Sequence, residues 1–264
     1  MRILVRDGIG TAGSSSGVVD ITAHRLAALT GAAVEWVSWP AAMAGVGGRS
    51  TWTAGARRGL ADLRRRVGAG GTADWGDELV LLAYSGGNRI VHDFLDAHPE
   101  QLGRVRAVGL MSDPFRPRDR FQAGLPEPGG WGLCGERLGP IPERTRWCAV
   151  PGDVITAAEP DAILRTVADV SANVPGGLRR DVAEILFGGR FQLVWQVDSA
   201  RRDPLGWLAG LGGRLARARL DVERYFTGWH TTNYTRRATG GGPGVAELFA
   251  DELYELVGEG AAVG

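Results

Sequence analysis

Lysine is absent from this sequence, cysteine is rare, and long apolar segments are missing. The 30 side chains of the Lys and Arg class are all arginines, and 30 Asp and Glu residues balance them to a formal net charge of +0. A chain without net charge has no overall electrostatic attraction for nucleic acid or for an anionic membrane. We therefore expect no nucleic-acid partner. Because no apolar segment is long enough to cross a bilayer, we also expect no transmembrane segment.

The two cysteines, Cys134 and Cys148, flank a segment that contains glycine and proline and that could bring them together. Two cysteines do not define a disulfide framework, so a disulfide and a pair of free thiols both stay open. The first residues of the chain become polar and rich in glycine before a signal-peptide core could form. We therefore expect a protein that is made in the cytoplasm without a signal peptide.

The length of 264 residues and the hydrophobic content of 44% suit one α/β domain with an insertion. Short apolar runs predict buried strands, and segments with helical periodicity lie between several of them. Strands that alternate with helices form parallel sheets covered on both faces, so we expect a central, mostly parallel sheet. The expected strands cover residues 3–5, 34–39, 79–83, 105–111 and 147–150, and the expected helices cover 18–29, 54–67, 88–97 and 245–257.

The segment 80–87 joins an expected strand to an expected helix and reads Val-Leu-Leu-Ala-Tyr-Ser-Gly-Gly. Small residues, Ala83 and Gly87, stand two positions before and two positions after Ser85. This is the pattern of a nucleophile elbow, a sharp turn that holds a serine hydroxyl clear of the sheet. The amide of Gly86 would lie at a helix N-terminus, where it can bind a developing oxyanion. The alternative is a tight turn whose glycines only permit close packing.

A nucleophilic serine needs a base, and the chain has four histidines. His24 and His92 fall within helical patterns and His98 ends one, which favours surface or packing roles. His230 lies in the segment 228–234, Gly-Trp-His-Thr-Thr-Asn-Tyr, which we expect to be a loop shortly before the final helix. This is where α/β-hydrolases place their base, so we predict His230 as the base.

The base in turn needs an acid that orients it and stabilises its cation. Asp153 follows the expected strand at 147–150, and the loops at the carboxyl ends of parallel strands converge on one site. Asp113, which follows the strand at 105–111, is the alternative acid. The chain order Ser85, Asp153, His230 matches the order of nucleophile, acid and base in α/β-hydrolases.

A competing motif follows the first expected strand, where residues 8–13 read Gly-Ile-Gly-Thr-Ala-Gly. This spacing matches the dinucleotide-binding fingerprint, but the second expected strand ends without the acidic residue that would hold a ribose. We therefore favour a different use of the loop, as the source of the second oxyanion amide. Ile9 and Thr11 both stay open as its donor.

Several helical patterns lie between the expected acid and base, over residues 162–170, 178–186 and 208–225. We expect residues 154–229 to form a helical cap or linker inserted into a hydrolase core made of residues 1–153 and 230–264. Peripheral helices without a role at the site are the alternative.

These segments together resemble the cutinase-like α/β-hydrolases, and most closely the mycobacteriophage lysin B esterases. The resemblance is carried by the elbow at 83–87, by Ser-Asp-Pro-Phe-Arg at 112–116, by Pro-Gly-Asp at 151–153 and by His230. It covers most of the chain, including the helical insertion, which compact cutinases lack. The elbow reads Ala-Tyr-Ser-Gly-Gly where Gly-Tyr-Ser-Gln-Gly is common in the family.

The resemblance implies a serine esterase that needs no metal or organic cofactor. Its substrate would be the ester between mycolic acid and arabinogalactan, or another long-chain ester, cleaved at the cell envelope during phage lysis of an actinobacterial host. A general cutinase or lipase-type carboxylesterase and a non-catalytic binding protein of the hydrolase fold are the alternatives. Tryptophans of the insertion and its border would line an apolar site for the acyl chain, with plain core packing as the alternative: Trp195, Trp207 and Trp229.

Overall fold

The central sheet of the computed structural model has five strands in the order β2-β1-β3-β4-β5, and neighbouring strands run parallel. The structure describes residues 1–11, 15–43, 46–68, 78–137, 139–171, 193–236 and 241–259. The prediction of a central parallel sheet is confirmed. The second and fifth strands begin and end earlier in the sequence than expected. The strands are β1 (Arg2–Arg6), β2 (Ala33–Trp36), β3 (Leu79–Tyr84), β4 (Val105–Met111) and β5 (Thr145–Cys148).

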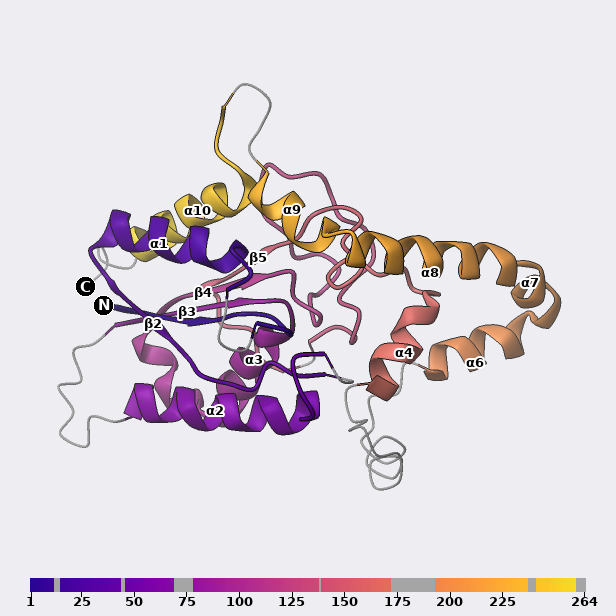
Figure 1. Cartoon of the computed structure of the whole chain (residues 1–264), viewed down its shortest axis with the longest axis horizontal. Helices are drawn as coiled ribbons and strands as arrows, with labels where there is room; N and C mark the ends of the chain where they lie inside the picture. The colour runs from indigo at the N-terminus through magenta and orange to yellow at the C-terminus, as the bar shows by residue number, and fades with distance from the viewer. Residues whose placement is uncertain are drawn as a thin grey trace.

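Helices cover both faces of this sheet, as Figure 1 shows. One face packs against α1 (Val18–Thr30) and α10 (Val245–Glu259), and the other packs against α2 (Trp52–Gly68) and α3 (Asn88–Ala97). These four helices correspond to the four expected in the core. The carboxyl ends of the strands therefore lie between two helical layers, where loops can meet to form a site.

The central strand β3 shows why the core has two halves. Its six residues are all buried, and alternate side chains point to opposite faces. Val80, Leu82 and Tyr84 join the apolar cluster under α1 and α10, whereas Leu79, Leu81 and Ala83 join the cluster under α2 and α3. Burial on both faces explains the continuous apolar run in the sequence. It also fixes the position of Ser85, the next residue.

Among the described residues, four further helices form an extension that projects away from the sheet in Figure 1, with α7 at its far end. They fall within residues 154–229, and α9 (Trp229–Thr235) follows them and leads back to the sheet. The predicted helix over 178–186 lies outside the described residues, and the predicted domain boundaries stay predictions. The helices of the extension are α4 (Ile163–Ser171), α6 (Leu193–Arg202), α7 (Pro204–Ala209) and α8 (Leu211–Phe226).

The buried side chain of Arg116 organises the long connection between β4 and β5. Its guanidinium lies 2.7 Å from the carbonyl oxygen of Thr156, which belongs to the loop after β5. The same group donates to carbonyl oxygens of its own loop. Arg116 thereby ties together the two loops that follow β4 and β5. The five carbonyls of its own loop lie 2.8 to 3.1 Å away, in Pro117, Arg118, Arg120, Gly129 and Gly130.

Cys134 and Cys148 are free thiols, so the disulfide alternative is wrong. The physical reason is their placement on opposite sides of the sheet. Cys148 is buried in the cluster under α1 and α10, whereas Cys134 packs against the cluster under α2 and α3. In the described part of the chain, we find no helix with the length and apolar character needed to cross a membrane.

Candidate active site

Ser85 occupies the sharp turn between β3 and α3, in the short helix η1 (Ser85–Gly87). Its φ of 52° lies in the left-handed region, which is costly for a residue with a side chain and is characteristic of strained functional turns. The side-chain amide of Asn88 holds the turn by donating to the carbonyl oxygens of Ser85, at 2.8 Å, and Met111, at 2.9 Å. The predicted elbow is therefore present.

Two glycines let the neighbouring backbone approach this turn. A Cβ atom on Gly87 would lie 2.5 Å from the carbonyl oxygen of Asp7, and one on Gly8 would lie 3.0 Å from the Cβ of Ser85. A real Cβ cannot come that close to a backbone oxygen, so Gly87 is required by the contact with Asp7. The loop after β1 consequently lies directly against the nucleophile turn.

His230 lies with its Nε2 atom 2.9 Å from the Oγ of Ser85. The sequence predicted a loop here, but His230 stands in the first turn of helix α9, so that expectation was wrong. The helix begins after Gly228, whose φ of 84° turns the chain out of α8. Tyr84 stacks on the imidazole at 5.0 Å, and its hydroxyl donates to the His230 carbonyl at 2.7 Å. These contacts fix the ring against Ser85.

Asp153 completes the chain of hydrogen bonds, with its Oδ1 atom 3.0 Å from Nδ1 of His230. Its other carboxylate oxygen, Oδ2, accepts hydrogen bonds from the hydroxyls of Ser112, at 2.5 Å, and Tyr234, at 2.7 Å. Burial acts to raise the pKa of Asp153. The positive charge of His230 and the hydrogen bonds from His230, Ser112 and Tyr234 outweigh burial, and the pKa lies below its usual value. The carboxylate is therefore held as an anion facing the imidazole.

Asp113, the alternative acid, belongs to a different cluster. Its Oδ2 atom lies 2.9 Å from Nε2 of His92 and accepts a 2.9 Å hydrogen bond from the indole of Trp147. Arg137 contacts the other ring nitrogen of His92 at 2.9 Å. Asp113 thus joins α3 to β5, and the structure brings Asp153 rather than Asp113 to His230.

The candidate oxyanion donors come from two segments, η1 and the loop after β1. Gly86 follows the serine in η1, and the side chain of Ile9 packs over it, with Cδ1 2.6 Å from where a Gly86 Cβ would stand. In the loop after β1, the amide of Gly8 donates to the carboxylate of Asp7, and that of Gly10 donates to Ala41. Those two amides are engaged, so Ile9 and Thr11 both stay predicted as the second donor.

The same loop argues against the dinucleotide alternative. The buried carboxylate of Asp7 accepts hydrogen bonds from the amides of Gly8 and Ser16, both at 2.6 Å. These amides are the kind of donor that a pyrophosphate would use, and a buried carboxylate already occupies them. Gly13 lies outside the described residues.

The three tryptophans predicted to bind substrate lie in different places. Trp229 precedes His230, is 37% exposed, and has Arg224 over its ring at 5.4 Å. Trp207 lies on α7 at the far end of the extension (Figure 1), where its ring packs under Arg214, so it does not lie beside Ser85. Trp195 belongs to α6, and its side chain lies outside what the structure describes.

Sequence reasoning missed three residues that hold the site together: Ser112, Tyr234 and Asn88. Tyr234 stands four positions after His230, which places both on one face of a helix, but the signal is readable only if α9 is recognised as a helix. Ser112, with a φ of 45°, directly follows β4 and precedes Asp113, so its place just after a strand was the available signal.

Solved structures that are similar to this chain include lysin B from Mycobacteriophage D29, which has a TM-score of 0.58 and 16% sequence identity over 96% of this chain and 98% of that chain. A cutinase-like protein from Cryptococcus sp. is 18% identical, with a TM-score of 0.44, over 59% of this chain and 78% of its own. The catalytic core domain of acetyl xylan esterase from Trichoderma reesei is 15% identical, with a TM-score of 0.46, over 64% of this chain and 92% of its own.

No family model and no curated protein sequence match this chain. At these low sequence identities, the structural similarity is evidence for the fold alone. The likeness to lysin B extends over nearly the whole chain, the region of the extension included. Together with the five-stranded parallel sheet, it identifies the chain as having the cutinase-like α/β-hydrolase fold, shared with lysin B along nearly its full length.

Proposed function

We propose that this protein is a serine carboxylic-ester hydrolase. The observation that carries the proposal is the continuous hydrogen-bonded line from Ser85 Oγ through His230 to Asp153, with bonds of 2.9 and 3.0 Å. Such a line is the arrangement that a hydroxyl nucleophile needs, because the base must reach its proton and the acid must orient the base. The positive φ of Ser85 and its place directly after β3 support the nucleophile role.

The proposed reaction begins when Nε2 of His230 takes the proton of Ser85 and the serine oxygen attacks the ester carbonyl. The amide of Gly86 and one amide of the loop after β1, from Ile9 or Thr11, stabilise the oxyanion. His230 then gives its proton to the leaving alcohol, which departs and leaves an acyl-serine. Water, deprotonated by His230, attacks this ester, and the collapse of the second intermediate returns the proton to Ser85. Asp153 stabilises the imidazolium in both halves.

We further propose that the substrate is a long-chain ester of a cell-envelope glycan, namely the mycolic acid ester of arabinogalactan. This rests on the family resemblance in the sequence and on the likeness to lysin B over 96% of the chain. The protein would be made in the cytoplasm of a phage-infected actinobacterium and would act at the cell envelope once lysis begins. Trp229, beside His230, is the predicted tryptophan best placed to contact an acyl chain.

Release of mycolic acid from purified mycolyl-arabinogalactan tests this proposal, run beside hydrolysis of p-nitrophenyl butyrate. We expect the wild type to release mycolic acid and Ser85→Ala to fall to background, because the variant lacks the attacking oxygen. Turnover of p-nitrophenyl butyrate alone would support the serine esterase but contradict the proposed substrate. No turnover of either ester would contradict the esterase and favour a binding protein of the hydrolase fold.

A further inference from the structure

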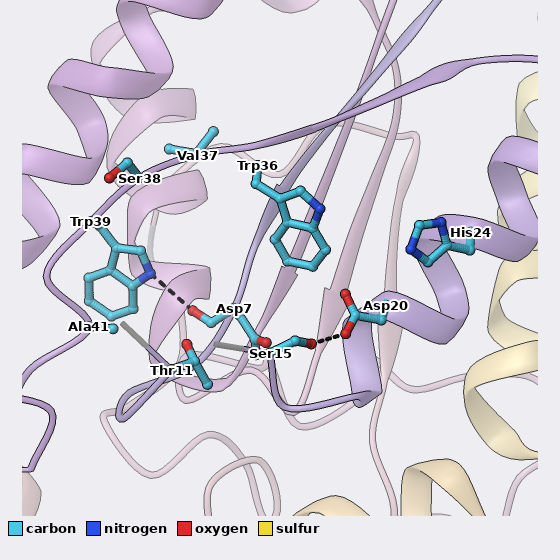
Figure 2. A pocket seen from close by; sticks show the side chains of 10 residues that line it. All are labelled: Asp7, Thr11, Ser15, Asp20, His24, Trp36, Val37, Ser38, Trp39 and Ala41. Atoms are coloured by element: carbon cyan, nitrogen blue, oxygen red, sulfur yellow. Dashed lines mark hydrogen bonds between the residues drawn. The ribbon is translucent and has the colours of Figure 1, made fainter. Parts of the chain in front are cut away.

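An open cavity of about 650 Å³ lies beside the loop after β1. Its walls come from that loop, from the first turns of α1 and from the end of β2, and Figure 2 shows the side chains that line it. Of its lining residues, only Thr11 has a candidate role in the proposed ester hydrolysis, through its backbone amide. The cavity is bordered by Trp36, whose side chain is 38% exposed at the edge of the sheet.

The lining combines one accessible aromatic ring with several short polar groups. The indole of Trp36 faces the cavity between Trp39 and His24, and Asp20 lies next to His24 (Figure 2). An exposed indole offers a flat apolar surface, while carboxylate, imidazole and hydroxyl groups around it accept and donate hydrogen bonds. A sugar ring needs both, because its C–H face is apolar and its rim carries hydroxyls.

Charge at the cavity disfavours an anionic ligand. Both carboxylate oxygens of Asp7 already accept hydrogen bonds from backbone amides, and the Asp20 carboxylate accepts one from the hydroxyl of Ser15. Burial and the nearby Asp7 raise the pKa of Asp20, as expected for carboxyls close together. Two carboxyls disfavour an anion. Among the described residues, no group of three or more His, Cys, Asp or Glu could hold a metal ion.

The cavity is coupled in space to the nucleophile through a few residues of one loop. Asp7 lines the cavity, and Gly8, the next residue, packs against the Cβ of Ser85. Thr11, also in the lining, donates its hydroxyl to the Gly8 carbonyl at 2.6 Å. The loop after β1 therefore borders both the cavity and Ser85, as a site for a second unit of the same polymer requires.

We propose that the cavity binds a neutral sugar unit of the glycan that carries the scissile ester, a unit other than the esterified one. Trp36 stacks on the sugar ring, and Asp20 and His24 bind its hydroxyls. This inference rests on the proposed function, because it takes the alcohol part of the ester to be a glycan. The cavity would then select esters of polysaccharides over simple alkyl esters.

Calorimetric titration with arabinogalactan fragments freed of acyl chains tests the inference on the Ser85→Ala protein, which cannot turn over. We expect the fragments to bind, and we expect Trp36→Ala in that background to weaken binding by about fivefold or more, since it removes the stacking ring. We expect Trp36→Phe in the same background to bind more tightly than Trp36→Ala, because it keeps an aromatic ring. Tyr254→Ala, which removes an aromatic ring that is 43% exposed on α10, is the matched control and leaves binding unchanged.

The outcomes separate this inference from the esterase proposal. Absence of binding by the Ser85→Ala protein, or binding that Trp36→Ala leaves intact, overturns the sugar site even if the wild type hydrolyses esters. Binding that depends on Trp36 supports the site even if the wild type releases no mycolic acid. Thermal unfolding of each variant shows whether it is folded, and Asp20→Asn, which keeps Trp36, provides a second variant expected to weaken binding.

Discussion

At the scale of single residues, the two oxygens of Asp153 have different tasks. Oδ1 faces His230, whereas Oδ2 accepts two hydroxyls, from Ser112 and Tyr234. Because both hydroxyls lie on the same oxygen, they fix the rotation of the carboxylate and leave Oδ1 to the imidazole and to the backbone amide of Ile155, which donates at 3.2 Å. Hydrogen bonds to a buried anion are among the stronger ones in proteins. The stability of the fold and the orientation of the base are thus linked through Asp153.

The Tyr234→Phe variant tests this link. A carboxyl whose folded-state pKa is lowered adds stability above its unfolded-state pKa of about 3.9, and this stability is lost as the pH falls through the folded-state pKa. The pKa of Asp153 is lowered in this way. We expect the variant to lose about 1.5–3 kcal/mol of unfolding free energy at pH 7, and less at about pH 3.

Urea denaturation at both pH values measures these losses. Tyr254→Phe, at an exposed position of α10, is the control and should change the unfolding free energy at neither pH. Equal losses for Tyr234→Phe at the two pH values would show that its hydroxyl does not act through the Asp153 charge.

The two buried aspartates provide a second prediction at this scale. Asp153→Asn removes the charge that faces His230, so kcat for p-nitrophenyl butyrate should fall by about 10⁴-fold. Asp113→Asn changes the contact with His92 and Trp147 instead, and kcat should stay within about tenfold of the wild type. Steady-state kinetics of the two variants shows which aspartate acts on His230. An equally large loss of kcat in Asp113→Asn would refute the assignment of Asp153 as the acid.

At the scale of elements, the turn from β3 to α3 was predictable and the position of α9 was not. The elbow depends on local residue size, and a short sequence carries that information in Ala83, Ser85 and Gly87. The segment 228–234 is rich in threonine and aromatic residues, which have modest helix propensity, so its helix was predicted as a loop. Packing of Tyr234 and His230 against Tyr84 stabilises it, and such long-range contacts are invisible to local patterns.

Gly87 supports a prediction for the elbow as an element. A Cβ there would meet the Asp7 carbonyl oxygen at 2.5 Å, and this oxygen belongs to the backbone of the residue that directly follows β1. We expect Gly87→Ala to lower the unfolding free energy by about 1–3 kcal/mol through overpacking and to lower esterase activity with it. Gly103→Ala is the matched control, since nothing lies within 4 Å of its added Cβ. A Gly87→Ala protein as stable as Gly103→Ala would contradict the close packing of the two loops.

At the scale of the whole molecule, the site is assembled from segments far apart in the chain. His230 lies 145 positions from Ser85 and 77 from Asp153, and the parallel sheet brings the three together at one edge. The parallel sheet was predictable because apolar periodicity indicates its strands and the helices between them. The order of the three site residues is read directly from the sequence. The hub formed by Arg116 was not predictable, because its partners are backbone carbonyls of loops that have no sequence pattern.

Reaction with a fluorophosphonate probe, mapped by peptide mass spectrometry, tests the central claim most directly, because the probe forms a covalent adduct only with an activated nucleophile. We predict a single adduct on Ser85, none in Ser85→Ala, and labelling of His230→Gln slowed by about a hundredfold or more, since the base is lost. An adduct on another residue, or labelling of His230→Gln as fast as the wild type, would contradict the account.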